Sequence, residues 1–485
     1  RHWDSWETPG NYSRAFALAL GADGKVTGAA TALDGPPGTL TGDTPSKPSG
    51  GAEELAWQAD SRGVFFAARQ ADRREPTSTN LDIWHAPLDG TAPHNLTADN
   101  PATDTLPAAS PDGKWLAWAA MARPGYEADR LVVQLLNLKT GQKRALTAGW
   151  DRSVGSLAWT SDSKAVIATA QDVLDTPAFR IDIASGKVER LKLAPKGQTE
   201  ANIANVVPLK DGRIVFTRDA IAGPAEVFIA AKGKPGTALS QANAATLAAL
   251  TPVSTARFSF AGAEGATVWG QIHKPANASG KLPVLLFVHG GPQGSYNDAW
   301  SSRWNPALFA AQGYAVVSVD FHGSTGYGQA FTDAINRDWG GKPLEDLKKG
   351  LDAALARDPA LDGTRTCALG ASYGGYMMNW IQSEWSGRFQ CLVNHNGVFD
   401  NRGMAYSTEE LWFAEWEHGG KPYHEAPDEY EKWNPASRVA RWQTPMLVVL
   451  GEKDFRIPYS QGLGAFTALQ RKGVPAELLV FPDEN

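Results

Sequence analysis

Cysteine is scarce in this sequence, since only Cys367 and Cys391 occur among its 485 residues. Two cysteines cannot build a disulfide framework, and they do not form a CxxC metal pair. Each lies in a short apolar run, where a free cysteine behaves as a small hydrophobic side chain. We therefore predict two unbonded core cysteines that carry no information about the cellular compartment.

Long apolar runs and a basic excess are also lacking. No run approaches the roughly 20 residues that a membrane-spanning helix needs. The net charge of −6 argues against a nucleic-acid-binding protein, which would carry a basic stripe. No HExxH or other clustered His/Cys pattern indicates a metal site. No methionine or signal peptide precedes Arg1, so we interpret the chain as trimmed and draw no conclusion about export.

A repeated pattern fills the first half of the chain. A length of 485 residues favours two or more domains, and residues 1–250 consist of short apolar runs separated by turn residues. Four of these turns contain Asp60, Asp112, Asp162 and Asp211, which are 52, 50 and 49 residues apart. Such residues suit hairpins, and a second hairpin lies between successive copies. Four strands per period indicate the blade of a β-propeller.

The near-constant period favours this propeller over a β-sandwich with chance spacing. We expect four blades and a leading fragment from Tyr12 to Thr31, with further blades upstream of Arg1.

From residue 251 the pattern changes to strands that alternate with helices. The predicted strands are residues 284–288, 315–319, 366–369, 391–393 and 446–450, and the clearest helix runs from Leu344 to Leu355. This alternation indicates a mostly parallel, doubly wound sheet. We thus predict a β-propeller over residues 1–250 and an α/β-hydrolase domain over residues 251–485, which lacks its C-terminal end. The boundary is placed in the alanine-rich stretch 242–250.

A serine nucleophile is the strongest functional candidate. Gly370-Ala-Ser372-Tyr-Gly374-Gly375 has the G-x-S-x-G pattern, follows an apolar strand and precedes a helix-like run. This context is typical of a nucleophile elbow, in which glycines permit the sharp turn that exposes the serine Oγ. The N-terminus of the following helix favours developing negative charge. We predict that Ser372 is the nucleophile.

An oxyanion hole requires two preorganised donors. The backbone N–H of Tyr373 supplies one of them, because it follows the nucleophile. The loop His289-Gly-Gly-Pro292 follows an earlier strand and supplies the other, for which we favour Gly291. A plain Gly-Pro turn is the alternative interpretation of this loop.

The triad acid is predicted at Asp454, after the strand 446–450, with Glu452 as its competitor. This acid would orient a histidine, which follows the acid along the chain in this fold. No histidine lies beyond His424, and the run from Glu477 to Asn485 is typical of a last strand that enters a loop. We expect the triad histidine just after Asn485, and we expect the 485 residues alone to be inactive.

These motifs together resemble the prolyl oligopeptidase family of serine peptidases over most of the chain. They are the Ser-Pro-Asp-Gly-Lys type of repeat, His289–Pro292, Gly323–Gly328, Gly370–Gly375 and Asp454–Pro458. Residues 408–416 and the terminal Phe-Pro-Asp-Glu-Asn are similar to the dipeptidyl peptidase 5 branch, where the terminal motif continues into the catalytic histidine. The resemblance implies a periplasmic or secreted enzyme.

The resemblance also implies substrate-binding residues. Arg456 would bind a substrate carbonyl near P2, with a surface salt bridge as the alternative. The aromatic segment 398–416 is where such enzymes build the S1 pocket, and Tyr406 and Trp412 are its predicted walls unless they are core aromatics. Glu409 and Glu410 either bind a substrate ammonium group or lie on a solvated helix face, and we favour the second interpretation.

The predicted function is a serine exopeptidase that releases N-terminal dipeptides from oligopeptides through an acyl-enzyme. The propeller would lie over the C-terminal edge of the sheet and exclude folded proteins. The alternatives are an acylaminoacyl peptidase that removes blocked N-terminal residues, an esterase, and a propeller binding module with an inactive hydrolase domain. We expect a peptide substrate, no nucleic acid, membrane, metal or cofactor, and leave a homodimer open.

Overall fold

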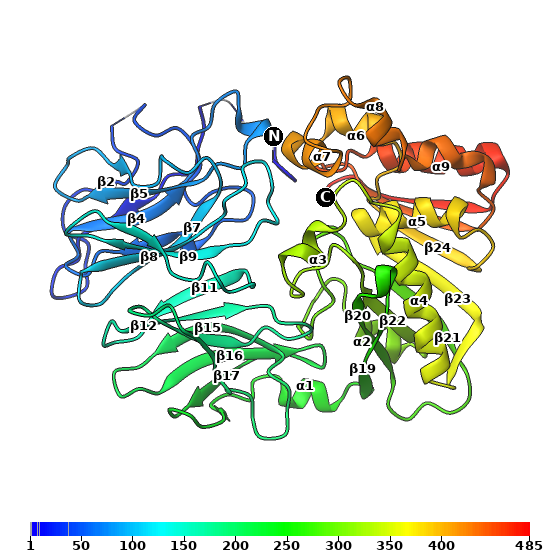
Figure 1. Ribbon diagram of the computed structural model, residues 1–485, viewed down its shortest axis with the longest axis horizontal. Helices are drawn as coiled ribbons and strands as arrows, with labels where there is room; N and C mark the ends of the chain where they lie inside the picture. The colour runs from blue at the N-terminus through cyan, green and yellow to red at the C-terminus, as the bar shows by residue number, and fades with distance from the viewer. Residues whose placement is uncertain (1, 7, 9, 37) are drawn as a thin grey trace.

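The computed structural model describes residues 2–485 except 7, 9 and 37. Arg1 lies outside the described residues. Figure 1 shows two lobes, with the first half of the chain in blue to green on the left and the second half in green to red on the right.

The left lobe consists of antiparallel sheets, each built from strands that follow one another along the chain. Within the described residues there are four such four-stranded sheets, preceded by a small pair of strands. The pair is β1 (Phe16–Ala17) and β2 (Thr31–Ala32). The sheets are β3 (Leu55–Trp57), β4 (Gly63–Ala68), β5 (Asp82–Pro87) and β6 (His94–Asn95); β7 (Asp104–Ala109), β8 (Trp115–Ala120), β9 (Val132–Asn137) and β10 (Lys143–Ala145); β11 (Val154–Trp159), β12 (Ala165–Ala170), β13 (Ala178–Asp182) and β14 (Val188–Arg190); and β15 (Asn202–Pro208), β16 (Ile214–Ala220), β17 (Gly223–Ala230) and β18 (Thr237–Ala238).

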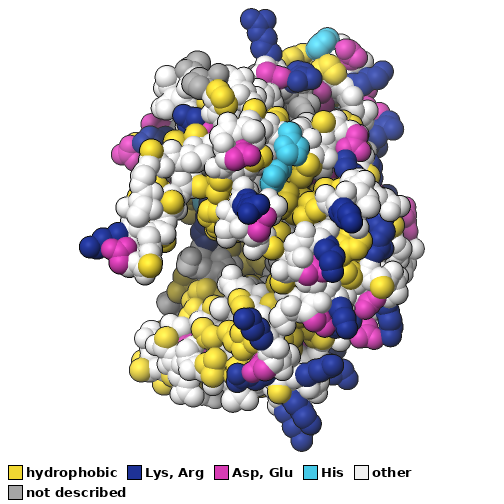
Figure 2. Space-filling model, turned by 90° about the vertical axis from the view of Figure 1, so that its left-hand side faces the viewer, with side chains coloured by type: hydrophobic (Ala, Val, Ile, Leu, Met, Phe, Trp, Pro, Cys, Tyr) yellow, Lys and Arg dark blue, Asp and Glu magenta, His cyan; other side chains and the backbone are white. Residues whose placement is uncertain are grey.

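The repeated aspartates occupy the same place in every sheet, the turn of its first hairpin. Each carboxylate accepts a hydrogen bond of 3.0–3.1 Å from the backbone N–H two residues later, as Asp60 does from Arg62. This local bond stabilises a tight turn, which explains why the motif recurs. Figure 2 views this lobe from outside and shows acidic and basic side chains interspersed, with histidine side chains among them.

The right lobe is built on a single eight-stranded sheet. Its order is β19 (Val253–Ala261), β20 (Thr267–Pro275), β22 (Ala315–Asp320), β21 (Leu282–Val288), β23 (Leu361–Ala371), β24 (Cys391–His395), β25 (Met446–Gly451) and β26 (Ala476–Phe481). The pairs β19–β20 and β20–β22 are antiparallel, and the strands from β22 to β26 are all parallel. The strands predicted from the sequence are confirmed.

Helices cover both faces of this sheet. They are α2 (Pro306–Ala311), α3 (Gln329–Asp333), α4 (Lys342–Arg357), α5 (Tyr373–Glu384), α6 (Asn401–Ser407), α7 (Leu411–Glu417), α8 (Pro427–Glu431) and α9 (Ser460–Lys472). In β21, Val284 and Leu286 pack with residues of α4 and α5, whereas Leu285 and Phe287 pack with Ala310 of α2. Alternate side chains of a strand point to opposite faces, so β21 is buried on both sides.

The predicted helix at residues 344–355 is confirmed by α4, which buries Leu344, Leu347 and Leu351. Short 3-10 turns lie at Ala52–Glu54, Glu75–Thr77, Ala263–Gly265 and Pro435–Arg441. The arrangement is a β-propeller domain followed by an α/β-hydrolase domain. The boundary at residues 242–250 stays a prediction; the short helix α1 (Ala244–Ala248) lies within this stretch.

The prediction of two unbonded cysteines is wrong, because Cys367 and Cys391 form a disulfide. The residues stand directly opposite each other in the parallel pair β23–β24, and their Cα atoms are 4.8 Å apart. Neighbouring strands lie about 4.8 Å apart in a sheet, so this register brings the two side chains together. The sequence does not reveal the register.

The two domains are joined by half-buried ion pairs. Arg123 of the propeller makes two hydrogen bonds, of 2.8 and 3.0 Å, with Asp333 of α3. Arg257 of β19 binds Asp175 of the propeller at 2.7 Å and Asp298 of its own domain at 2.9 Å. These contacts hold the propeller against the edge of the sheet where the parallel strands end.

Candidate active site

Ser372 occupies a sharp turn between β23 and α5. Its backbone has φ 59° and ψ −118°, a strained conformation for a residue with a side chain. The flanking glycines are required by close contacts. A Cβ at Gly370 would lie 2.6 Å from the backbone of Gly374, and a Cβ at Gly374 would overlap the carbonyl oxygen of Val288. The turn therefore has the geometry of a nucleophile elbow.

The predicted oxyanion residues lie beside this serine. Tyr373 is the first residue of α5, so its N–H has no acceptor within the helix. The loop that begins with His289-Gly-Gly-Pro292, here called the glycine loop, passes directly over the elbow. A Cβ at Gly290 would lie 3.3 Å from the Cβ of Ser372. Gly291 adopts φ 119° and lines the same pocket as Ser372. The structure thus brings Ser372, Tyr373 and Gly291 together.

Asp454 lies in the loop that follows β25, and it is 5% exposed. Its Oδ1 accepts hydrogen bonds from the backbone N–H groups of Arg456 (3.0 Å) and Ile457 (2.8 Å), and its Oδ2 accepts one from Asn396 (2.9 Å). Burial raises the pKa of Asp454 to about 6, although these hydrogen bonds oppose the shift. The competitor Glu452 is exposed, which favours Asp454 as the acid.

The His395 carbonyl accepts a hydrogen bond of 3.0 Å from the N–H of Ser372, but this contact involves the backbone alone. Among the described residues, no histidine side chain is hydrogen-bonded to Ser372 or Asp454; His289, for example, binds Ser324 at 2.8 Å. The last residues lie against the acid loop, because the N–H of Lys453 donates to the carbonyl of Glu484 at 3.0 Å. Figure 1 shows the C-terminus between the two lobes.

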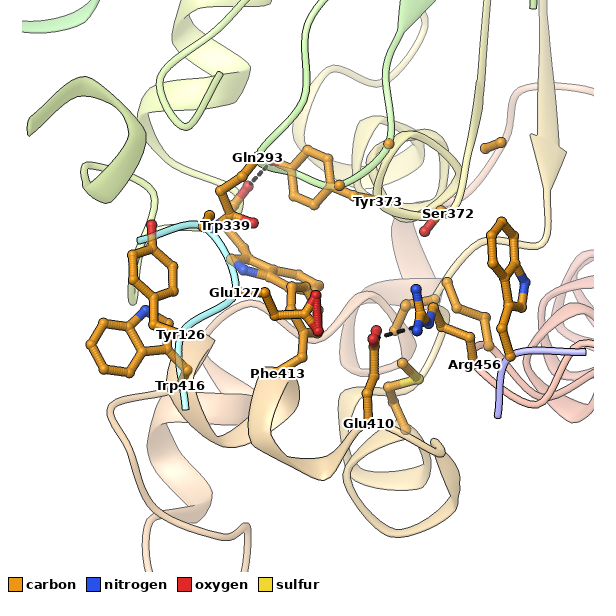
Figure 3. Close-up of a pocket in the computed structure, with 18 of the residues that line it drawn as sticks. Tyr126, Glu127, Gln293, Trp339, Ser372, Tyr373, Glu410, Phe413, Trp416 and Arg456 are labelled. Carbon is orange, nitrogen blue, oxygen red and sulfur yellow. Dashed lines mark hydrogen bonds and ion pairs between the residues drawn. The ribbon is translucent and has the colours of Figure 1, made fainter. Parts of the chain in front are cut away.

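A pocket of about 390 Å³ opens over Ser372. Both domains and the amino-terminal segment line it. Its aromatic walls are Trp3, Tyr126, Trp304, Trp339, Phe413 and Trp416, and its charged groups are Glu127, Arg303, Glu410 and Arg456. Figure 3 shows Glu127, on the propeller loop, beside Phe413 and Trp339, and Arg456 beside Glu410.

Arg456 is held inside this pocket by two glutamates. Its guanidinium binds Glu409 at 2.9 and 2.7 Å and Glu410 at 2.9 Å, and the ring of Trp3 lies 5.3 Å from it. Both glutamates are 5% exposed, so the favoured interpretation of a solvated helix face is wrong. Burial, with a contribution from Glu127, raises the pKa of Glu410 well above its usual range.

Tyr406 and Trp412 lie outside the residues that line the pocket. The Tyr406 side chain is 60% exposed and packs against Tyr423, with ring centroids 5.9 Å apart. Trp412 is buried, and its Nε1 donates to the carboxylate of Glu127. The structure therefore corrects the predicted pocket wall to Phe413 and Trp416, which are neighbours of Trp412 on α7. Trp412 contacts the site through its hydrogen bond with Glu127.

Sequence reasoning missed the residues that reach the pocket from outside the hydrolase domain. Tyr126 and Glu127 belong to a propeller loop, where Tyr126 stacks on Trp416 with ring centroids 4.4 Å apart. Trp3 is anchored by its carbonyl, which accepts a hydrogen bond of 2.8 Å from the N–H of Phe455. No local pattern signals these contacts, because they arise from packing between segments far apart in the sequence.

Comparisons with known proteins agree with this geometry. The sequence profile of the prolyl oligopeptidase family matches residues 300–485. Dipeptidyl-peptidase 5 of Porphyromonas gingivalis is 32% identical over all of this chain and 70% of the relative, and dipeptidyl-peptidase 5 of Schizosaccharomyces pombe is 34% identical with the same coverage.

Among solved structures, the acylaminoacyl peptidase of Pyrococcus horikoshii superposes with a TM-score of 0.74 at 22% identity. The match covers 88% of this chain and 65% of the archaeal chain. At this identity the likeness shows a shared fold. This chain spans somewhat less than two thirds of the archaeal protein's length.

Proposed function

This chain belongs to the prolyl oligopeptidase family of serine peptidases, and on that premise we propose that it releases dipeptides from the free N-terminus of oligopeptides. The relatives named dipeptidyl-peptidase 5 support this activity. The observation that carries the proposal is the acidic pair Glu127 and Glu410 in the pocket beside Ser372. A free peptide N-terminus is an ammonium group, which carboxylates are suited to bind. Glu410 is buried, whereas Glu127, on the propeller loop, is exposed.

The proposed reaction follows the geometry of the elbow. The Oγ of Ser372 bonds to the scissile carbonyl carbon and gives its proton to a histidine, which Asp454 orients. The N–H groups of Tyr373 and Gly291 stabilise the oxyanion. The C–N bond then breaks, and the leaving amine takes the proton from the histidine. Water subsequently hydrolyses the acyl-enzyme and releases the dipeptide.

We propose that this histidine follows Asn485. The bond between the Lys453 N–H and the Glu484 carbonyl supports the proposal, since it places the end of the chain beside the acid loop. A protein that consists of these 485 residues alone should then lack peptidase activity. A fluorophosphonate probe should label Ser372 rapidly in a form extended through the next histidine and slowly in the 485-residue form; equal labelling would contradict the proposal.

Substrate selection is assigned to the charged and aromatic walls. Arg456 is proposed to bind the backbone carbonyl near P2, because a guanidinium held by Glu409 and Glu410 keeps a donor available to the pocket. Phe413 and Trp416 are proposed to contact the P1 side chain. An acylaminoacyl peptidase would gain nothing from carboxylates at the substrate amine, so the pocket favours the dipeptidyl activity.

Paired chromogenic substrates test this assignment. The full-length protein should cleave a dipeptidyl 4-nitroanilide with a free amine and should cleave its N-acetylated counterpart much more slowly. The Ser372→Ala variant, as control, should cleave neither. Preference for the acetylated substrate would contradict the dipeptidyl activity and favour the acylaminoacyl one.

Export to the periplasm or the cell exterior is also proposed. The Cys367–Cys391 disulfide supports it, because disulfides persist in oxidising compartments. Across the described residues, every helix is too short or too polar to cross a membrane. A homodimer stays a prediction, which analytical ultracentrifugation can test.

A further inference from the structure

Glu417 is a buried carboxylate that lies behind the residues lining the pocket. It is the last residue of α7 and is 1% exposed. Its two oxygens accept different hydrogen bonds: Oε2 accepts from the Trp339 indole at 2.7 Å, and Oε1 accepts from the Gln293 amide at 2.7 Å. Both partners line the pocket. One side chain therefore connects two separate segments of the site.

Gln293 belongs to the glycine loop that supplies one of the two proposed oxyanion donors. It lies two residues after Gly291, and a Cβ at Gly291 would approach the backbone nitrogen of Gln293 to 2.5 Å. This part of the loop is folded back on itself. A bond that fixes the Gln293 side chain consequently restricts the position of the Gly291 amide.

Trp339 supports the other proposed donor. Its carbonyl accepts a hydrogen bond of 2.5 Å from the hydroxyl of Tyr373, and the two rings lie edge to face at 5.3 Å. Figure 3 shows Trp339 and Tyr373 on the same side of the pocket as Gln293. Holding the indole of Trp339 thus restricts the start of α5, where the Tyr373 amide is located.

We infer that Glu417 is a positioning residue that holds both oxyanion amides at the correct separation and joins them to the pocket wall. The inference rests on the proposed function of Ser372, Tyr373 and Gly291. Oxyanion donors act only when they are already aimed at the developing charge. A shift of about 1 Å in such a group can reduce a rate about 100-fold.

The burial of Glu417 is consistent with a role beyond packing. Loss of solvation raises its pKa to about 7, and the nearby carboxylates Asp333 and Glu127 add to this shift. An apolar side chain of similar size would avoid this desolvation cost, but it could not accept the two hydrogen bonds. Helix α7 also presents Phe413 and Trp416 to the pocket, so the same carboxylate connects the proposed P1 wall with the oxyanion hole.

The test compares four variants of the full-length protein. Glu417→Ala removes both hydrogen bonds, and Gln293→Ala removes one. In Glu417→Gln, the side-chain oxygen can still accept the hydrogen bond from the Trp339 indole. The new side-chain NH2 can donate to the side-chain oxygen of Gln293 once the Gln293 amide group has turned over. Glu415→Gln, on the same helix but outside the residues that line the pocket, is the matched control. The readouts are kcat and KM for the free dipeptidyl substrate and the rate at which a fluorophosphonate labels Ser372.

We expect Glu417→Ala to reduce kcat and the labelling rate by about 10- to 100-fold while KM changes by less than about threefold. Gln293→Ala should give an intermediate loss, and Glu417→Gln should remain close to the parent protein, as should Glu415→Gln. A folded Glu417→Ala protein that labels at the parent rate would overturn the inference. If this variant does not fold, a parent-like labelling rate in Gln293→Ala, or a loss in Glu417→Gln as large as 100-fold, would overturn it.

The labelling rate separates this inference from the proposed function. A fluorophosphonate places its oxygen in the oxyanion hole whatever peptide the enzyme prefers. An incorrect choice of peptide substrate therefore abolishes the kcat measurement but leaves the ranking of the labelling rates intact.

Discussion

Replacing Glu410 by glutamine is the sharpest test of how the substrate amine is recognised. The change removes one buried carboxylate and keeps its size. Glu409 still holds Arg456 through two hydrogen bonds of 2.9 and 2.7 Å, so the arginine should stay in place. We expect the variant to lose affinity for the ammonium group of a free dipeptidyl substrate and to treat an N-acetylated substrate as before.

The magnitude follows from the surroundings of Glu410. Loss of one partner of a buried charge pair costs about 2–5 kcal/mol. Glu127 also lines the pocket and remains as a second carboxylate, so the lower end applies. A loss of about 2 kcal/mol corresponds to a decrease of about 30-fold in kcat/KM for the free substrate, whereas the acetylated substrate should change by less than about threefold.

The same residue should produce a pH dependence. Burial, with help from Glu127, raises the pKa of Glu410 well above its usual range, so the ionised fraction increases as the pH rises through that value. In the parent protein kcat/KM for the free substrate should rise over this range until the substrate amine deprotonates near pH about 8. Glu410→Gln should lose the part of this rise that is specific to the free substrate, and it should keep the part that comes from deprotonation of the triad histidine and is shared by both substrates.

Steady-state kinetics from pH 5 to 9 with the paired substrates measures both effects. Glu409→Gln is the control, because it weakens the hold on Arg456, leaves Glu410 and Glu127 in place, and should impair both substrates alike. An equal loss for free and acetylated substrates in Glu410→Gln, or no loss for either, would refute the assignment of Glu410 to the amine.

Three further changes test other parts of the structure. Asp454→Asn in the full-length protein should lower kcat by about 10⁴-fold, as expected for a triad acid; a loss below tenfold in steady-state assays would remove it from the triad. Replacing Cys367 and Cys391 by serine opens a loop with a sequence separation of 24 and should lower the free energy of unfolding by about 3 kcal/mol; an unchanged midpoint in urea would contradict the disulfide. Trp3→Ala should raise KM about fivefold for free and acetylated substrates alike, because a cation–π contact contributes about 1 kcal/mol; parent-like KM values would show that Trp3 does not bound the occupied pocket.

Short-range patterns predicted the elbow and the repeats because their determinants are local. The turn at Ser372 depends on glycines within three residues of it. Each blade turn depends on one aspartate that binds a backbone N–H two residues later. Such features can be recognised from the sequence alone.

The pocket walls and the disulfide could not be predicted from such local patterns. The pairing of Cys367 with Cys391 depends on the register of two parallel strands. The pocket walls depend on how three distant segments pack, and α7 turns Trp416 toward Tyr126 while it turns Trp412 toward Glu127. The sequence places the right aromatic residues in the right segment, but it does not show which of them face the cavity.

The propeller loop that carries Tyr126 and Glu127 has a consequence for how the molecule can be divided. A fragment cut near residue 250 would keep Ser372 and its elbow, yet it would lose part of the wall that surrounds the substrate. Selectivity is therefore shared between domains that look like independent modules, and grafting this hydrolase onto another propeller would produce a different enzyme. Substitutions in a propeller blade can therefore change which substrates the enzyme binds without any change at Ser372.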